Sequence, residues 1–110
     1  MPEFTSPFTA SAPPETTPDD HLIARAVRFQ ISAELEAVNQ YDEIIQVTTN
    51  PLVKEVLRSI LMEEKKHLGE LLALLYTLSP IDRSLAADGD SEVADIRVRQ
   101  MRAESTLSDS

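Results

Sequence analysis

The chain has 110 residues and no cysteine, and 19 acidic residues against 10 basic ones give it a formal net charge of −9. This length fits one small domain, the lack of cysteine excludes disulfides and thiolate metal sites, and the acidity argues against a nucleic-acid partner. With two glycines and 5% aromatic residues, the composition favours an all-α fold over a sheet-rich one.

Neither a signal peptide nor a membrane span is apparent in the sequence. The N-terminus has no basic segment followed by an apolar one, and the longest uninterrupted apolar run is Leu71–Tyr76. A run of this length is far too short to cross a bilayer. We therefore expect a cytoplasmic protein with no membrane association.

Two long helices are predicted, each with a recognisable start. Residues 1–17 are rich in Pro, Thr and Ser and predict a disordered arm that ends at a capping residue, Thr17. A first helix is expected over 18–48, with proline in its first position. A second helix is expected over 51–78, capped by Asn50.

The two helices are separated only by the stretch Thr49-Asn50, so they should form an antiparallel hairpin over residues 18–80. Ser79-Pro80 is interpreted as the stop of the second helix. The polar stretch "AADGDSE" then predicts a break. Residues 81–110 are expected to form a polar tail that contains a short amphipathic helix over 91–103 and ends in disorder.

One face of each helix is apolar except near its middle. In the second helix, steps of four and three residues select six large aliphatic residues and two polar ones, Glu64 and His67. The same steps in the first helix select Ile23, Val27, Gln30, Glu34, Ala37, Tyr41, Ile44 and Thr48. Each predicted seam therefore carries a carboxylate.

The polar residues of the two seams should meet. Glu34 and Glu64 lie about fifteen residues before and after the turn, so in a hairpin they reach the same height. Buried carboxylates are costly unless paired or metal-bound, and neither seam offers a lysine or arginine. Glu34, Glu64 and His67 are therefore predicted to bind Fe, Mn or Zn. The alternative is a chance Glu-x-x-His motif at a helix edge.

A single hairpin supplies only half of a known type of centre. Di-iron carboxylate bundles use a glutamate from each of two helices and a Glu-x-x-His motif from each of the other two. A two-fold dimer of this hairpin supplies that set, and a further row of Leu61, Leu68, Leu72 and Leu75 is expected to face the partner. The predicted fold is thus a hairpin that dimerises into a four-helix bundle.

Four more residues are candidates for supporting roles. Tyr41 shares the face of Glu34 and is predicted to hydrogen-bond a ligand carboxylate, or else to be an ordinary interface tyrosine. Glu36, Glu63 and Glu70 flank the seam. They either guide incoming cations or are simply solvated surface residues.

Two segments, "AELEAVNQYDEI" at 33–44 and "EEKKHLGELLALL" at 63–75, resemble the encapsulated ferritin family. Its members are two-helix ferritin-like proteins that are housed inside encapsulin shells or fused to the N-terminus of the shell protein. The resemblance implies that Glu34, Glu64 and His67 bind iron, near Tyr41, at a di-iron centre between two subunits. It also implies a ring-shaped decamer and ferroxidase activity, with the ferric product stored in an encapsulin nanocompartment.

Some features depart from the family. A secondary metal site of two acids and a tryptophan is reduced here to Glu36, with Ala33 and Gln40 at the other two positions. The ending "AESTLSDS" does not match the usual shell-targeting peptide, so residues 81–110 are either a linker or a divergent targeting segment. Two other functions stay open: a non-catalytic, metal-stapled assembly module, and another di-iron oxidase or peroxidase.

Overall fold

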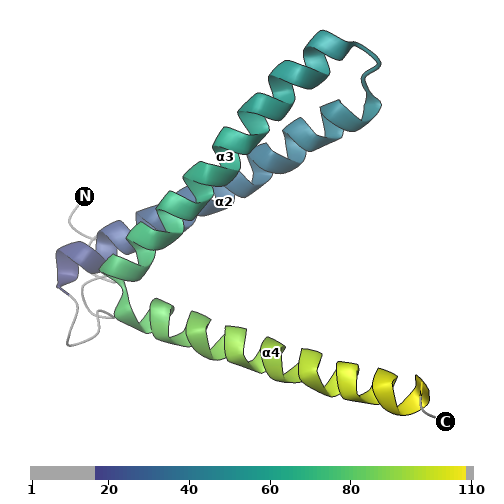
Figure 1. Ribbon diagram of the computed structural model, residues 1–110. Helices are drawn as coiled ribbons and strands as arrows, with labels where there is room; N and C mark the ends of the chain where they lie inside the picture. Colours follow the sequence, from purple (N-terminus) through teal and green to yellow (C-terminus); the bar gives the residue numbers. More distant parts are fainter. Residues whose placement is uncertain (1–16, 109–110) are drawn as a thin grey trace.

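The computed structural model describes residues 17–108, which form three helices and no strand. Helix α2 spans Pro18–Val47, α3 spans Pro51–Leu78 and α4 spans Pro80–Ser108. Helices α2 and α3 lie side by side as an antiparallel hairpin, whereas α4 points away from it (Figure 1). The all-helical class and the hairpin are as predicted. The expected disordered arm, apart from Thr17, lies outside the described residues.

The first two helices begin where the sequence predicts. The Thr17 side chain accepts a hydrogen bond from the backbone N–H of Asp20 at 3.0 Å. The Asn50 side chain accepts from the N–H of Leu52 at 3.0 Å and, more weakly, from that of Val53. In both cases a proline follows the cap, in a position where no N–H is needed. Helix α2 ends at Val47, one residue before the predicted end.

The predicted break and short helix over 91–103 are wrong, because α4 runs without interruption from Pro80 to Ser108. Ser79 ends α3, and its hydroxyl accepts from the N–H of Asp82 at 3.4 Å, so it also caps α4. Ser79-Pro80 is therefore a stop and a start at once. Polar residues can continue a solvated helix, and one internal glycine, Gly89, costs only about 1 kcal/mol.

The core of the hairpin is small. Its buried cluster consists of Ala24, Val27 and Leu75, and four partly buried residues pack against it: Ile31, Leu71, Tyr76 and Leu78. Ile45 is also buried, close to the turn. These positions show that α2 presents a slightly different face to α3 than the predicted seam.

On the face of α2 toward α3, half of the predicted seam positions are replaced by the residue that follows each of them in the chain. This row of buried or half-buried positions consists of Ala24, Val27, Ile31, Glu34, Val38, Tyr41, Ile45 and Thr48, and Ala37 of the predicted seam is half-buried as well. Half of the row belongs to the predicted seam. The other predicted positions include Ile23 and Ile44, which are 45% and 43% exposed. Neighbouring residues lie about 100° apart around a helix. The predicted positions and the residues that follow them therefore lie on opposite sides of the line through Glu34, and only the second row faces α3.

The leucine row expected to face a partner is already partly covered within the single chain. Leu75 is buried, and Leu61, Leu68 and Leu72 are half-buried. Four exposed apolar residues lie on the other flank: Leu74 and Val56 are seven and eleven residues from His67, and Ile23 and Ile44 are seven and fourteen from Gln30. Spacings of two, three or four helical turns keep these residues on the flank that His67 and Gln30 share.

The single chain is extended. Its radius of gyration is 20.2 Å, whereas a compact domain of this size has about 13 Å. Helix α4 buries none of its residues, and it meets the hairpin only at its start. There Arg28 of α2 donates through Nε and Nη2 to Asp82 Oδ2, at 2.9 and 2.7 Å. Within residues 17–108, no helix has the length and apolarity needed to cross a membrane.

Candidate metal centre

The three predicted ligands converge in the structure. One ligand atom each from Glu34, Glu64 and His67 lies within 4.8 Å of the other two. Glu34 comes from the middle of α2, whereas Glu64 and His67 are one turn apart on α3. His67 Nδ1 lies 3.9 Å from Glu64 Oε2, since residues three apart share a helix face. The three atoms are close enough to bind one cation together.

The Glu34 carboxylate lacks a partner for one of its oxygens. Oε1 accepts a long hydrogen bond of 3.4 Å from Gln30 Nε2. Oε2 is buried, and no hydrogen-bond donor reaches it from the described part of the chain. A buried carboxylate oxygen in this state is costly, and a bound cation would remove the cost. Two carboxylates and one imidazole suit iron, manganese or zinc, so the residues present fit such an ion.

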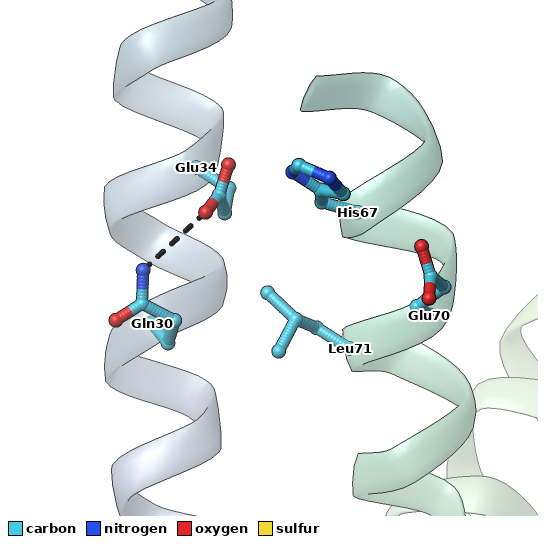
Figure 2. Close-up of a pocket in the computed structure, with 5 residues that line it drawn as sticks. All are labelled: Gln30, Glu34, His67, Glu70 and Leu71. Atoms are coloured by element: carbon cyan, nitrogen blue, oxygen red, sulfur yellow. Dashed lines mark hydrogen bonds between the residues drawn. The ribbon is translucent and has the colours of Figure 1, made fainter. Parts of the chain in front are cut away.

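The site opens to solvent on one side. A hollow of about 360 Å³ is lined by Gln30, Glu34, His67, Glu70 and Leu71. Figure 2 shows Glu34 and His67 pointing toward one another from the two helices, with Leu71 reaching toward α2 below them. The side chain of His67 is 49% exposed, whereas that of Glu64 is 20% exposed. One chain therefore surrounds a cation from one side only.

No basic side chain neutralises this cluster. Across residues 17–108, neither Glu34 nor Glu64 forms an ion pair with a lysine or an arginine. The contact between Glu64 and His67 is an ion pair only when the imidazole is protonated. The two carboxylates thus place negative charge at one point between the helices, where it attracts cations.

Of the four residues predicted to have supporting roles, only one lines the hollow. Glu70 lines the hollow, whereas Glu36 and Glu63 are exposed residues outside it. Tyr41 is half-buried, and among the described residues no hydrogen bond joins its hydroxyl to any of the three ligands. The roles expected of these four residues stay predictions.

The role of Gln30 was not predicted from the sequence, in which this residue was only a polar position of the first seam. In the structure its amide donates to Glu34 and its side chain lines the hollow. The signal was present in the spacing, because a glutamine four residues before a glutamate lies on the same helix face.

Three curated proteins are similar to the chain. It is 36% identical over 80 residues to the encapsulin nanocompartment cargo protein EncC of Myxococcus xanthus, a match that covers 73% of the chain and 59% of EncC. It is 34% identical over 70 residues to a ferritin-like-encapsulin shell fusion protein of Pyrococcus furiosus, over 64% of the chain and 20% of the relative. It is 32% identical over 68 residues to the cargo protein EncB of Myxococcus xanthus, over 62% of the chain and 41% of EncB.

The chain thus spans less than two thirds of the length of each of these relatives. No protein-family model matches it. No solved structure gives a significant match either.

Proposed function

We propose that this chain, which belongs to the encapsulated ferritin-like family, is a ferroxidase that prepares iron for storage within an encapsulin nanocompartment in the cytoplasm. One observation carries the proposal: three ligand atoms from Glu34, Glu64 and His67 lie within 4.8 Å of one another, and one of the carboxylate oxygens is buried without a partner. The compartment is inferred from the names of the relatives.

The centre is completed by a second copy of the chain. One chain contributes two carboxylates and one imidazole around an open hollow. A two-fold axis doubles this set to four carboxylates and two imidazoles, which neutralise and bind two divalent ions. Exposed apolar residues share the flank of the opening by helical spacing and would be covered in such a four-helix bundle: Ile23, Ile44, Val56 and Leu74. Such dimers would in turn form the ring-shaped decamer.

In this proposal the residues hold the substrate Fe²⁺ so that it reacts with O₂. Glu34 presents its free Oε2 to the metal, while Gln30 holds the other oxygen. Glu64 and His67 supply the remaining ligands from this chain. Two Fe²⁺ each give one electron to one O₂, which takes up two protons and leaves as hydrogen peroxide. The four carboxylates favour the more highly charged Fe³⁺ product.

The remaining acidic residues and Tyr41 fit supporting roles. Glu70 lies in the hollow beside His67, where it can hold a cation on its way in. Glu36 and Glu63 add negative charge on the surface nearby. Tyr41 lies two turns from Glu34 and would reach the ligand carboxylates once the partner packs against the hairpin.

Iron oxidation by the full chain tests the proposal. Anaerobic protein is mixed with Fe²⁺, air is admitted, and the rise of Fe³⁺ absorbance is compared with that in protein-free buffer. The wild-type chain should oxidise iron faster than buffer, and Glu64→Ala should reduce the rate to the buffer level. The control is Glu43→Ala, which removes an exposed glutamate from the far side of α2 and should keep the wild-type rate.

Two results would reject the proposal. Oxidation no faster than in buffer would remove the ferroxidase function, and an active Glu64→Ala variant would remove this site. The mass in solution with and without metal then separates the alternatives. A mass that rises with Zn²⁺ or Fe²⁺ in a chain that does not oxidise iron would support a metal-stapled assembly module instead.

A further inference from the structure

Helix α4 is exposed along its whole length although it carries apolar residues. None of its residues is buried, and Leu85, Val93 and Ile96 are 59%, 57% and 46% exposed. Most helices in proteins owe their stability to the packing of an apolar face rather than to intrinsic propensity. The face of α4 thus lacks the packing that such a helix normally has.

The apolar stripe of α4 is symmetric about Ile96. Helical periodicity places five residues within about 20° of one line along the helix. They are Leu85, Gly89, Ile96, Ala103 and Leu107. The intervals between them are four, seven, seven and four residues. Read in either direction from Ile96, the stripe presents a small residue and then a leucine, and a Cβ added at Gly89 would meet nothing within 4 Å.

A stripe of charges runs beside this apolar line, and its sign changes along the helix. It consists of Asp88, Glu92, Asp95, Arg99 and Arg102, at steps of four, three, four and three. Within residues 17–108, none of these five forms an ion pair. Asp95, Arg99 and Arg102 line a shallow hollow with Val98, so they share one flank of the helix. Like charges three or four residues apart destabilise an isolated helix.

An antiparallel copy of the same helix pairs both stripes. We propose that α4 associates with α4 of a second copy of this chain around a two-fold axis at Ile96. In an antiparallel pair each flank faces the same flank of the partner. Glu92 lies four residues before Ile96 and Arg99 three residues after it, so they meet at almost the same height. Asp88 lies eight residues before Ile96 and Arg102 six residues after it, so these two are offset by about 3 Å along the axis.

The sequence of α4 favours this partner over an acidic molecule. A nucleic acid or acidic peptide would pair with the two arginines but would be repelled by the three acids beside them. A partner with the same charges in reverse order places an opposite charge against Glu92 and Arg99 and against Asp88 and Arg102, and it leaves only Asp95 without one. The small residues Gly89 and Ala103 would face each other there and let the helices approach closely. The pairing needs neither the metal nor the hairpin dimer, so it is independent of the proposed function.

Charge reversal tests this pairing in the full chain. Glu92→Arg and Arg99→Glu each place like charges opposite one another in a pair of identical chains. Each variant alone should lose association through α4, seen as a mass halved relative to wild type by light scattering in EDTA. An equal mixture of the two should recover the wild-type mass, because positions 92 and 99 of the two chains again place an acid against a base. Arg97→Glu, on the other flank, is the control and should keep the wild-type mass.

Cross-linking locates the axis, and the lack of native cysteine makes this direct. Ile96→Cys should form a disulfide between two chains under mild oxidation. Ser105→Cys, nine residues away and on the opposite side of the helix, should not. The Ile96→Cys disulfide should persist when Glu64→Ala is added, which separates this pairing from the metal centre.

Three results would overturn the inference: unchanged masses for both charge variants, a mixture that does not recover the wild-type mass, or equal cross-linking through positions 96 and 105. Association of α4 with an encapsulin shell protein but not with itself would overturn it as well.

Discussion

At the scale of single residues, the surroundings of Glu34 bear on why a small hairpin has a carboxylate in its seam. It occupies a position that a leucine would otherwise fill, between residues that pack on α3, and one of its oxygens has no donor within the described residues. This arrangement lowers the stability of the metal-free chain and raises its affinity for a cation, because binding removes the unpaired charge.

Replacing this carboxylate by an apolar side chain should therefore stabilise the metal-free protein. We expect Glu34→Leu to raise the free energy of unfolding by about 1 kcal/mol in EDTA, since a buried unsatisfied acceptor is removed. Urea titration followed by circular dichroism measures it, with the exposed Glu43→Leu as a control that leaves stability nearly unchanged. A loss of stability in Glu34→Leu would show that the carboxylate is well accommodated without metal.

The convergence of the three candidate ligands was predictable from the sequence, but the side on which the site opens was not. Glu64 and His67 are fixed by helical spacing, and Glu34 by its distance from the turn, and both depend only on the rise of the helix. The rotation of α2 about its own axis depends on side-chain volume. It brings Ala24, 1% exposed, against α3 and leaves Ile23 outside.

At the scale of helices, Ser79 separates two long elements by a single residue. It is 5% exposed, ends α3 and caps α4 through the N–H of Asp82. The same logic of cap followed by proline predicted the starts of α2 and α3. Applied to "SPID" it predicts α4 too, but the low apolar content beyond Pro80 suggested a tail. A helix whose apolar stripe is thin is hard to recognise from its periodicity alone.

Loss of this cap should weaken the junction. We expect Ser79→Ala to lower the free energy of unfolding by about 1 kcal/mol, the usual effect of removing an N-cap side chain. Thermal unfolding followed by circular dichroism measures the change, and Ser84→Ala, an exposed serine within α4, should leave the midpoint unchanged. Equal effects of the two substitutions would contradict a capping role for Ser79.

The ion pair of Arg28 with Asp82 matters more for the direction of α4 than for the free energy of unfolding. Its side chains are 43% and 27% exposed, and pairs this accessible contribute less than about 1 kcal/mol. It joins α2 to the first turn of α4, so α4 is held at two points: the Ser79 junction and this pair. The direction of α4 relative to the hairpin is set by these contacts.

At the scale of the whole molecule, one chain covers little of its own apolar surface. Four hydrophobic residues are buried among those described: Ala24, Val27, Ile45 and Leu75. A domain with a core this small is marginal unless association adds to it. The sequence predicted association from half of a metal site and from a leucine row, and of that row Leu75 is buried within the single hairpin while Leu61, Leu68 and Leu72 are half-buried.

Stability should therefore depend on protein concentration. We expect the midpoint of thermal unfolding to rise with chain concentration, and to rise further with Fe²⁺ added under anaerobic conditions, because only the associated form gains these contacts. Differential scanning fluorimetry over a hundredfold dilution series measures it. A midpoint that does not change with dilution would show that the single hairpin is stable alone.

The single-residue junction at Ser79 also links local geometry to the architecture of any assembly. One residue inserted after it would turn α4 by about 100° around its axis and advance it by about 1.5 Å. The hairpin and its metal ligands would be untouched, yet the apolar line through Ile96 would point elsewhere. In an assembly built through α4, the direction from one chain to the next would therefore depend on this joint, and it could change without any change at Glu34, Glu64 and His67.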